Sequence, residues 1–218
     1  MNNFKQIAID GPAAAGKSTV AKLMANRLNF VYLDTGAMYR AVTWAVLHHQ
    51  VDITDEQAIG NLLADLNLRL TPEGNVFVNE HDVTAAIREQ DVTTYVPQVA
   101  TYQVVREDLK RRQTILAQST NIIMDGRDIG TNVLPHADFK FFMVANPRIR
   151  AERRHKENLS KGIPSDIETL EKEIETRDQQ DQTRKHDPLK QAQDAILIDT
   201  STLSINEIVD KMVSIVLK

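Results

Sequence analysis

Cysteine is absent from this 218-residue chain, which excludes disulfide bonds and thiolate metal sites. Long apolar runs are also missing: none approaches the ~20 residues of a membrane-spanning helix. An expected strand at Ile7–Asp10 leaves no room before it for a secretory signal peptide. Basic residues are in no excess, since 26 lysines and arginines face 30 aspartates and glutamates. We therefore expect a cytoplasmic protein with no membrane or nucleic-acid partner.

Aromatic residues make up only 5% of the chain, so no stripe of stacking side chains is available for a nucleic acid. The basic run Lys110–Arg112 is surrounded by charges of both signs, which favours a solvated helix face. The single tryptophan, Trp44, is expected to pack against its neighbours. The histidines lack the spacing of metal ligands and are interpreted as surface or helix-end residues.

A phosphate-binding loop is the most informative feature that is present. The octapeptide at 11–18, GPAAAGKS, fits the pattern G-x-x-x-x-G-K-[ST]. Its glycines permit backbone angles and close approaches that side chains forbid, and its N–H groups can surround a phosphate at a helix N-terminus. In this pattern Lys17 reaches the outer phosphates and Ser18 offers a hydroxyl to Mg²⁺. The residues expected to hold the triphosphate are Gly11, Pro12, Ala13, Ala14, Ala15, Gly16, Lys17, Ser18 and Thr19.

Short, continuously apolar segments predict an α/β fold: a doubly wound five-stranded parallel sheet with helices on both faces. Ligands of such sheets bind beyond the carboxyl ends of the strands. Most of the predicted strands end in aspartate, and Asp125 there could help Ser18 to hold Mg²⁺ through water. Helix capping is the alternative role for these aspartates, and we assign it to Asp199. The predicted strands are Ile7–Asp10, Val31–Asp34, Asn121–Asp125, Phe139–Val144 and Ala195–Asp199.

A small antiparallel sheet is predicted within an insertion in this sheet. Leu66–Leu70 and Val76–Val78 alternate in polarity around the turn at 71–75, and 81–84 could add a third strand. The segment Tyr102–Gln118 predicts a long helix. We expect one structural unit, with a core at 1–50, 98–146 and 181–218 and the inserted region at 51–97.

A helical lid and a flanking helix are predicted at 147–180, with the lid itself at 148–165. A charged helix starts at Pro147, and the sequence Lys161-Gly162-Ile163-Pro164 interrupts it. Ser165 and Glu168 have the spacing of a capping box for a second helix. Two helices joined at a Gly-Pro break predict a hinged flap.

Arginines near strand ends suggest a second phosphate-bearing ligand. Arg40 follows the second predicted strand, and Arg127 with Asp128 follows the third. Arg177, Asp181 and Arg184 share one helix face by their spacing of i, i+4 and i+7. Spacing alone favours a solvated stripe of ion pairs for this face, with a ligand-binding face as the alternative.

Several segments together resemble the bacterial cytidylate kinase family in order and interval, over nearly the whole chain. DTGAMYR, DGRDIGT and the Arg-Asp-Arg helix are the specific ones, whereas the phosphate-binding loop is shared by many families. The resemblance implies phosphoryl transfer from ATP with Mg²⁺ to CMP or dCMP by a monomeric enzyme, with the insertion binding the monophosphate. The segments are GPAAAGKST (11–19), LDTGAMYR (33–40), VREDLKRRQ (105–113), DGRDIGT (125–131) and RDQQDQTR (177–184).

The resemblance also implies roles for individual residues. Arg40, Arg127 and Arg184 would hold the acceptor phosphate, and Arg177 and Asp181 would lie at the sugar. Thr35 would serve either the base or the phosphate. The lid would contribute further arginines, Arg153 among the catalytic ones.

Base selection follows from hydrogen-bond chemistry. Arg106 donating and Asp128 accepting would match cytosine and leave mismatched groups facing uracil, so UMP should be a poor acceptor. Some relatives carry a serine nine residues before the base-reading arginine, whereas this chain has Pro97. Proline offers no side-chain hydrogen bond, so any contact there must come from the backbone or from water.

Other functions fit the motifs less well. A kinase acting on a different small acceptor would need fewer groups for a sugar and a base. A GTP-binding switch would need an Asn-Lys-x-Asp segment, which is absent. A nucleic-acid motor would need a basic tract.

Overall fold

The computed structural model describes residues 4–71, 73–160 and 162–218. Its main sheet is parallel, five-stranded and ordered β2-β6-β1-β7-β8. The predicted strands are thus confirmed to within a residue at each end, and so is the doubly wound fold. The strands are β1 (Gln6–Asp10), β2 (Val31–Asp34), β6 (Ile122–Gly126), β7 (Phe139–Val144) and β8 (Ile196–Asp199).

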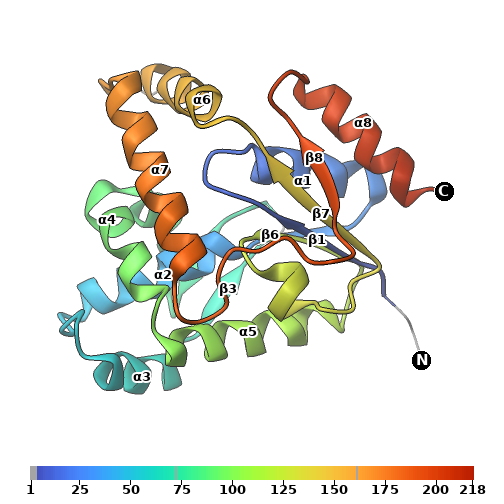
Figure 1. Ribbon diagram of the computed structural model, residues 1–218. Coiled ribbons are helices and arrows are strands. Elements are labelled where there is room, and N and C mark those ends of the chain that lie inside the picture. The colour runs from blue at the N-terminus through green and yellow to red at the C-terminus, as the bar shows by residue number, and fades with distance from the viewer. Residues whose placement is uncertain (1–3, 72, 161) are drawn as a thin grey trace.

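Helices cover both faces of this sheet because alternate strand residues bury apolar side chains on opposite sides. Ala8 of β1 packs in one core with residues of α2 (Thr35–His48), α3 (Glu56–Ala64) and α5 (Gln103–Ala117). Ile7 and Ile9 pack on the other side with α1 (Lys17–Leu28) and α8 (Ile205–Val216). Figure 1 shows α5 on one side of the sheet and α1 with α8 on the other.

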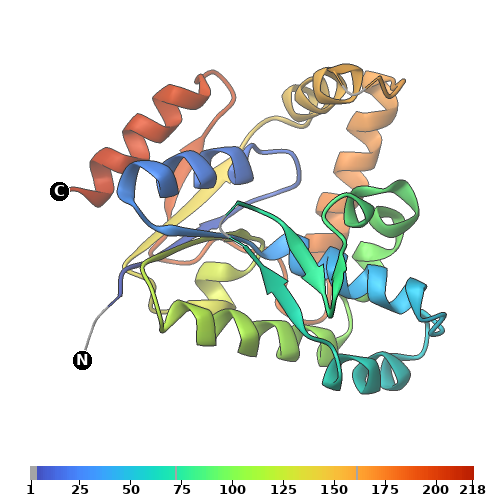
Figure 2. The same ribbon diagram turned by 180° about the vertical axis from the view of Figure 1, so that it is seen from behind.

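The inserted segment forms the predicted antiparallel sheet, with all three strands present. β3 (Leu68–Leu70) pairs with β4 (Val76–Val78), which pairs with β5 (His81–Asp82). The first strand starts later than the predicted Leu66, and Pro72 of the predicted turn lies outside the described residues. Val76 and Val78 pack on the alanine face of α2; Figure 2 shows this small sheet beside the helix. The short helix η1 (Ala86–Arg88) and α4 (Gln90–Val99) then lead back to α5.

The segment predicted as a lid and a flanking helix forms α6 (Pro147–Ser160) and α7 (Ile167–Thr183), which pack against each other. Lys161 of the predicted break lies outside the described residues, and Gly162 has a left-handed φ of 71°. The expected capping box is wrong. Asp166 caps α7 by accepting from the Thr169 N–H at 2.8 Å, and the Ser165 hydroxyl pairs instead with His155 Nδ1.

The aspartates at the strand ends do not all behave as expected. Asp34, not Asp199, caps a helix: its Oδ1 accepts from the Ala37 N–H at the start of α2. Asp199 accepts from the Ser201 N–H in a turn, and Ser204 caps α8. The chain turns between Asp199 and α8, so Ser204, five residues beyond Asp199, lies at the start of the helix. The division into a core, an inserted region and a lid remains a prediction.

Candidate active site

The phosphate-binding loop joins β1 to α1 at the carboxyl edge of the sheet. Gly11 has a φ of 148°, and a Cβ there would lie 2.1 Å from the main-chain oxygen of Met143 on β7. Gly16 has a φ of 86° and occupies the N-cap of α1. Both glycines are therefore required by the backbone, the first by contact and the second by conformation.

Lys17 is buried and folds over this loop, where its Nζ donates to the Pro12 carbonyl at 2.7 Å. Burial, followed by the positive charge of Arg127, lowers the pKa of Lys17 to about 7. The influence of Arg127 shows that the DGRD segment comes close to the loop lysine. Within the loop, Ala15 is buried and Ala14 has a left-handed φ of 57°, while Thr19 is exposed on α1.

Ser18 and Asp125 are in direct contact. The Ser18 hydroxyl donates to Asp125 Oδ2 at 2.8 Å, and the Tyr32 hydroxyl donates to Asp125 Oδ1 at 2.8 Å. Burial raises the pKa of Asp125, and the neighbouring charge of Asp34 adds to the rise. A cation would relieve this buried carboxylate, and oxygen ligands suit Mg²⁺. In the described ranges, no group of three or more histidines and carboxylates is placed to hold a metal.

The residues that follow β2 contact the aspartates at the ends of β2 and β6. The Arg40 guanidinium donates to Asp34 Oδ2 at 2.9 Å and its side chain is 21% exposed, so it is not the exposed charge that its helix position also allowed. Arg40 Nε is buried and has no hydrogen-bond partner within the described part of the chain. Thr35 is buried and donates its hydroxyl to the Asp125 carbonyl at 2.6 Å.

A cluster of positive charges joins the DGRD segment to α7. Arg127 Nε donates to Asp181 Oδ2 at 2.7 Å. Burial lowers the pKa of Arg177, and the charges of Arg127, Arg40 and Arg154 lower it further. Arg177 Nε has no hydrogen-bond partner among residues 4–71, 73–160 and 162–218. Such a cluster is poised for an anion, because it contains more buried positive charge than its carboxylates neutralise.

The expectation of a solvated stripe on this face is wrong. The Arg184 side chain is 6% exposed and that of Asp181 is 15% exposed. Burial alone would raise the pKa of Asp181, but Arg127, Arg177 and Arg184 outweigh it and hold that pKa below its usual value. Spacing showed that the residues share a face, but it could not show that the DGRD segment packs against them. Arg184 itself lies just beyond the last residue of α7.

Arg106 and Asp128 form the buried core of a second network. Arg106 Nη2 donates to Asp128 Oδ2 at 2.6 Å, and Arg184 Nη2 approaches Asp128 Oδ1 at 3.0 Å. Arg106 Nε also donates to Asp187 Oδ2 at 2.8 Å. Although burial opposes it, Tyr39, Asp128 and Asp187 raise the pKa of Arg106. Asp187 was not singled out from the sequence; its position just before Pro188, in a segment that must turn, is the signal that could have found it.

Asp10, at the end of β1, is a second residue that the sequence did not assign a role beyond its place at a strand end. Its carboxylate accepts from the N–H groups of Ile129 and Gly130, at 2.8 and 2.7 Å. Those groups open the short π-helical turn η2 (Ile129–Val133), which follows Asp128. Burial raises the pKa of Asp10 to about 6. Asp10 therefore fixes the segment that presents Asp128.

The lid arginines point in different directions. Arg153 donates to the carbonyl and hydroxyl of Thr200, at 2.5 and 3.1 Å, and the Thr200 hydroxyl lies 3.4 Å from the Ala15 carbonyl of the loop. Arg153 thus reaches the loop through Thr200. Arg150 is buried and contacts the loop directly.

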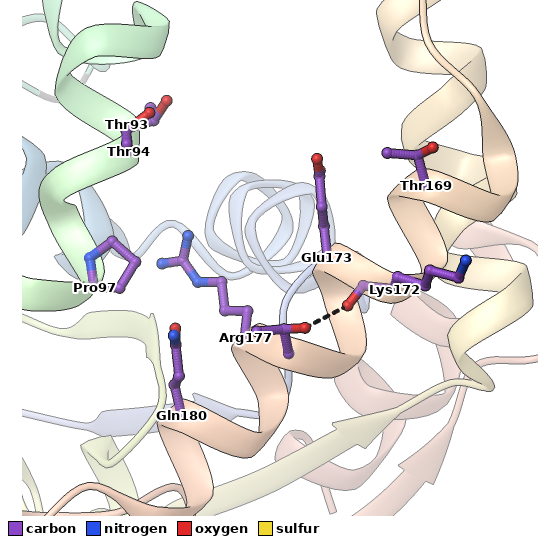
Figure 3. Close-up of a pocket in the computed structure, with 9 residues that line it drawn as sticks. Thr93, Thr94, Pro97, Thr169, Lys172, Glu173, Arg177 and Gln180 are labelled. Carbon is purple, nitrogen blue, oxygen red and sulfur yellow. Dashed lines mark hydrogen bonds between the residues drawn. The ribbon is translucent and has the colours of Figure 1, made fainter.

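A pocket of about 500 Å³ lies between α4 and α7. Figure 3 shows Arg177 extending from α7 toward Pro97 on α4, with Gln180 beside it. Threonines from both helices complete the walls. The pocket adjoins the cluster of positive charges because Arg177 belongs to both.

The cytidylate kinase family profile matches residues 7–218. The chain belongs to the cytidylate kinase family. The cytidylate kinase of Geobacillus sp. (strain WCH70) is 53% identical over 219 residues, which cover 99% of this chain and 98% of that protein. That of Listeria innocua is 54% identical and covers 96% of this chain and 94% of its own length. That of Leuconostoc mesenteroides is 51% identical, covering 99% and 97%. The resemblance seen in the sequence motifs is thereby confirmed.

Solved structures of other proteins share this fold. A shikimate kinase from Bacteroides thetaiotaomicron superposes with a TM-score of 0.52 at 13% identity, over 98% of this chain and 99% of that chain. An uncharacterized protein from Eubacterium ventriosum gives a TM-score of 0.57 at 12% identity, over 98% of both chains. At such identities the likeness concerns the fold alone. Within the described residues, none of the helices is both long enough and apolar enough to span a membrane.

Proposed function

We propose that this chain transfers the γ-phosphoryl group of ATP to CMP and dCMP, with Mg²⁺, to give ADP and CDP or dCDP. The P–O bond to ADP breaks as a bond forms to an oxygen of the acceptor phosphate. The observation that carries the proposal is the Arg177 Nε, which is buried beside Arg127 and has no hydrogen-bond partner in the described ranges. A bound nucleotide would satisfy it through a sugar oxygen, and the nucleotide's phosphate would relieve the repulsion among these arginines. Membership of the cytidylate kinase family supports the same acceptor.

The donor side is formed by the phosphate-binding loop. Its N–H groups and the positive end of α1 would bind the β- and γ-phosphates, and Lys17 would exchange its bond to the Pro12 carbonyl for a phosphate oxygen. Ser18 and Asp125 would hold Mg²⁺, Asp125 through water. When bound, that ion neutralises charge on the transferring phosphoryl group. Tyr32 orients the Asp125 carboxylate by donating to its second oxygen.

The acceptor phosphate would lie against Arg127, Arg40 and Arg184. Asp181 positions Arg127 through their 2.7 Å hydrogen bond, so the guanidinium is oriented before the reaction. Oriented charges of this kind are the main contribution of a protein to phosphoryl transfer. Donor and acceptor phosphates repel each other, and the array from Lys17 to Arg127 offers the cations that would separate them.

Base selection would rest on Arg106 and Asp128. Arg106 can donate to the O2 and N3 acceptors of cytosine, and Asp128 can accept from its exocyclic amine. Both side chains are held by other partners, Asp187 for the arginine and Arg184 for the aspartate. They therefore cannot rotate freely to suit uracil, which would leave buried polar groups unpaired. UMP is accordingly a poor acceptor in this proposal.

A coupled assay of ADP release tests the proposal. Purified protein would be given ATP–Mg²⁺ and a panel of monophosphates: CMP, dCMP, UMP, dTMP, AMP and GMP. We expect turnover with CMP and dCMP and a kcat/KM for UMP at least ~10²-fold lower, in the range that sites built on hydrogen bonds can achieve. Equal kcat/KM values for CMP and UMP would overturn the base assignment, and turnover of none of the panel would overturn the reaction.

A further inference from the structure

Arg150 connects three elements that surround the active site. Its side chain is 3% exposed, and its Nε donates to the Ala145 carbonyl at the end of β7 at 2.9 Å. Its Nη1 donates to the Ala13 carbonyl of the phosphate-binding loop at 3.0 Å. Its Nη2 lies 2.6 Å from Asp178 Oδ2 on α7. One guanidinium thus contacts the loop for the donor and the helix that carries Arg177 and Asp181.

Asp178 lies beside the candidate site residues of α7. It is adjacent to Arg177 and three residues before Asp181, which orients Arg127. Its side chain is 14% exposed, and its Oδ1 is buried without a hydrogen-bond partner among the described residues. The arrangement is costly for stability alone, because a buried ion pair must offset the desolvation of both charges. A positioning role would explain why such a pair is placed between the loop and α7.

We propose that the Arg150–Asp178 pair couples the two nucleotide sites. Binding of a triphosphate fixes the loop and with it the Ala13 carbonyl, and Arg150 transmits that constraint to α7. The acceptor groups on α7 are then oriented before CMP arrives. Arg150 and Asp178 are positioning residues in this scheme, since they act through the loop and through their neighbours on α7.

Coupling of this kind is reciprocal: the factor by which a donor tightens CMP binding equals the factor by which CMP tightens donor binding. The inference rests on the proposed two-nucleotide site. Calorimetry measures the factor directly, with CMP titrated into the protein alone and into protein saturated with a non-hydrolysable ATP analogue and Mg²⁺. We expect a factor within the ~5- to 150-fold range typical of coupled sites.

Asp178→Asn tests the pair, because it keeps the shape of the side chain and removes its charge. We expect the coupling factor to fall close to one, while the affinity for each nucleotide alone changes little. The matched control is Glu171→Gln. Glu171 pairs with Arg148 at 3.1 Å between the same two helices, but this pair is more exposed than Arg150–Asp178 and makes no hydrogen bond to the loop. The control should keep the wild-type factor.

The conservative variant Arg150→Lys covers the case in which Asp178→Asn fails to fold. A single ammonium cannot span all three partners in the fixed geometry of a guanidinium, so we expect partial loss of the factor. The proposal is overturned if the wild type shows no coupling, if the variants keep the wild-type factor, or if Glu171→Gln loses as much as Asp178→Asn. Failure of CMP to bind under any condition would instead contradict the proposed function.

Discussion

Arg127 and Asp181, which are 54 positions apart in the chain, are joined by a 2.7 Å hydrogen bond between Nε and Oδ2. Their pairing brings the DGRD segment after β6 against the end of α7. Removing the arginine would leave Asp181 with less compensation and would remove a cation next to Lys17 and Arg177. The bond therefore links the structure of the site to its expected chemistry.

Arg127→Met should lower kcat by ~10³-fold or more, the scale reported for arginines that stabilise phosphoryl-transfer transition states. The folded state should persist, because the side chain is 20% exposed and lies at the edge of the sheet. Steady-state kinetics with ATP and CMP, together with a thermal melt, measure both effects. Arg111→Met removes an arginine that is 61% exposed and pairs with Asp108 on its own helix, and it should leave kcat unchanged. A near-normal kcat for Arg127→Met would show that the clamp is wrongly assigned.

Asp128→Asn should reduce discrimination between CMP and UMP. An amide offers both a donor and an acceptor, so it can match either base where a carboxylate can match only the amine of cytosine. The ratio of kcat/KM for the two acceptors should fall by ~10-fold or more, as expected when one selective hydrogen bond is lost. Asn132→Ala is a suitable control, because Asn132 contacts the same carboxylate at 3.0 Å without belonging to the base-reading pair. If the ratio stays at the wild-type value, another group reads the base.

Pro97→Ser and Pro97→Ala should separate a helix effect from a hydrogen-bonding effect. Proline inside α4 cannot donate to the Thr93 carbonyl one turn earlier, so both variants should raise the melting temperature. Only serine adds a hydroxyl to the pocket wall, and it alone should lower the KM for CMP. Thermal melts measure the stability of each variant, and assays at varied CMP concentration measure its KM. The same KM in both variants would mean that the pocket wall at this position does not contact the acceptor.

Asp10 predicts a pH dependence of stability with a defined sign. Its pKa rises from 3.8 to about 6 on folding, so the folded state binds a proton more tightly than the unfolded chain does. The free energy of unfolding contributed by this group is greatest below pH 4, falls as the pH rises through 6, and is constant above. The loss is of order 3 kcal/mol, because each pH unit between the unfolded and folded pKa values contributes about 1.36 kcal/mol.

Urea unfolding at pH 4.5 and pH 7 measures most of this contribution, about 2 kcal/mol. Asp10→Asn cannot titrate, so its free energy of unfolding should rise relative to that of the wild type between pH 4.5 and pH 7. Asp138→Asn, which removes an exposed carboxylate beside β1, is the matched control for the same substitution at the surface. If the free energies of unfolding of the wild type and of Asp10→Asn differ by the same amount at both pH values, the expected titration is contradicted.

The sequence predicted the sheet well because β1 and β6 are buried on both faces, so their central residues read as continuous apolar runs. It predicted the phosphate-binding loop because the backbone there tolerates so few residues. It placed Arg106 and Asp128 together only through the family resemblance. Nothing local in either segment indicates their 2.6 Å contact.

What the sequence could not show was the packing between distant segments. The spacing of Arg177, Asp181 and Arg184 is the same whether their face meets water or the DGRD segment. Asp166 caps α7 in place of the predicted Ser165. Both residue types can cap a helix, but the Ser165 hydroxyl is paired with His155. Asp10 was one of several aspartates at strand ends, and only the turn at η2 distinguishes it.

A substitution at Gly11 would disturb folding as well as nucleotide binding, and an activity assay alone would not distinguish the two effects. Its missing Cβ would sit against the Met143 oxygen, so the first obstacle to any larger residue is the neighbouring strand and not a nucleotide. A survey that scored only catalysis would count Gly11 among the residues that touch ATP. Expression level and resistance to proteolysis would sort it instead with the residues that let β1 and β7 assemble, while Gly16, with open space around its Cβ position, would remain a matter of loop conformation.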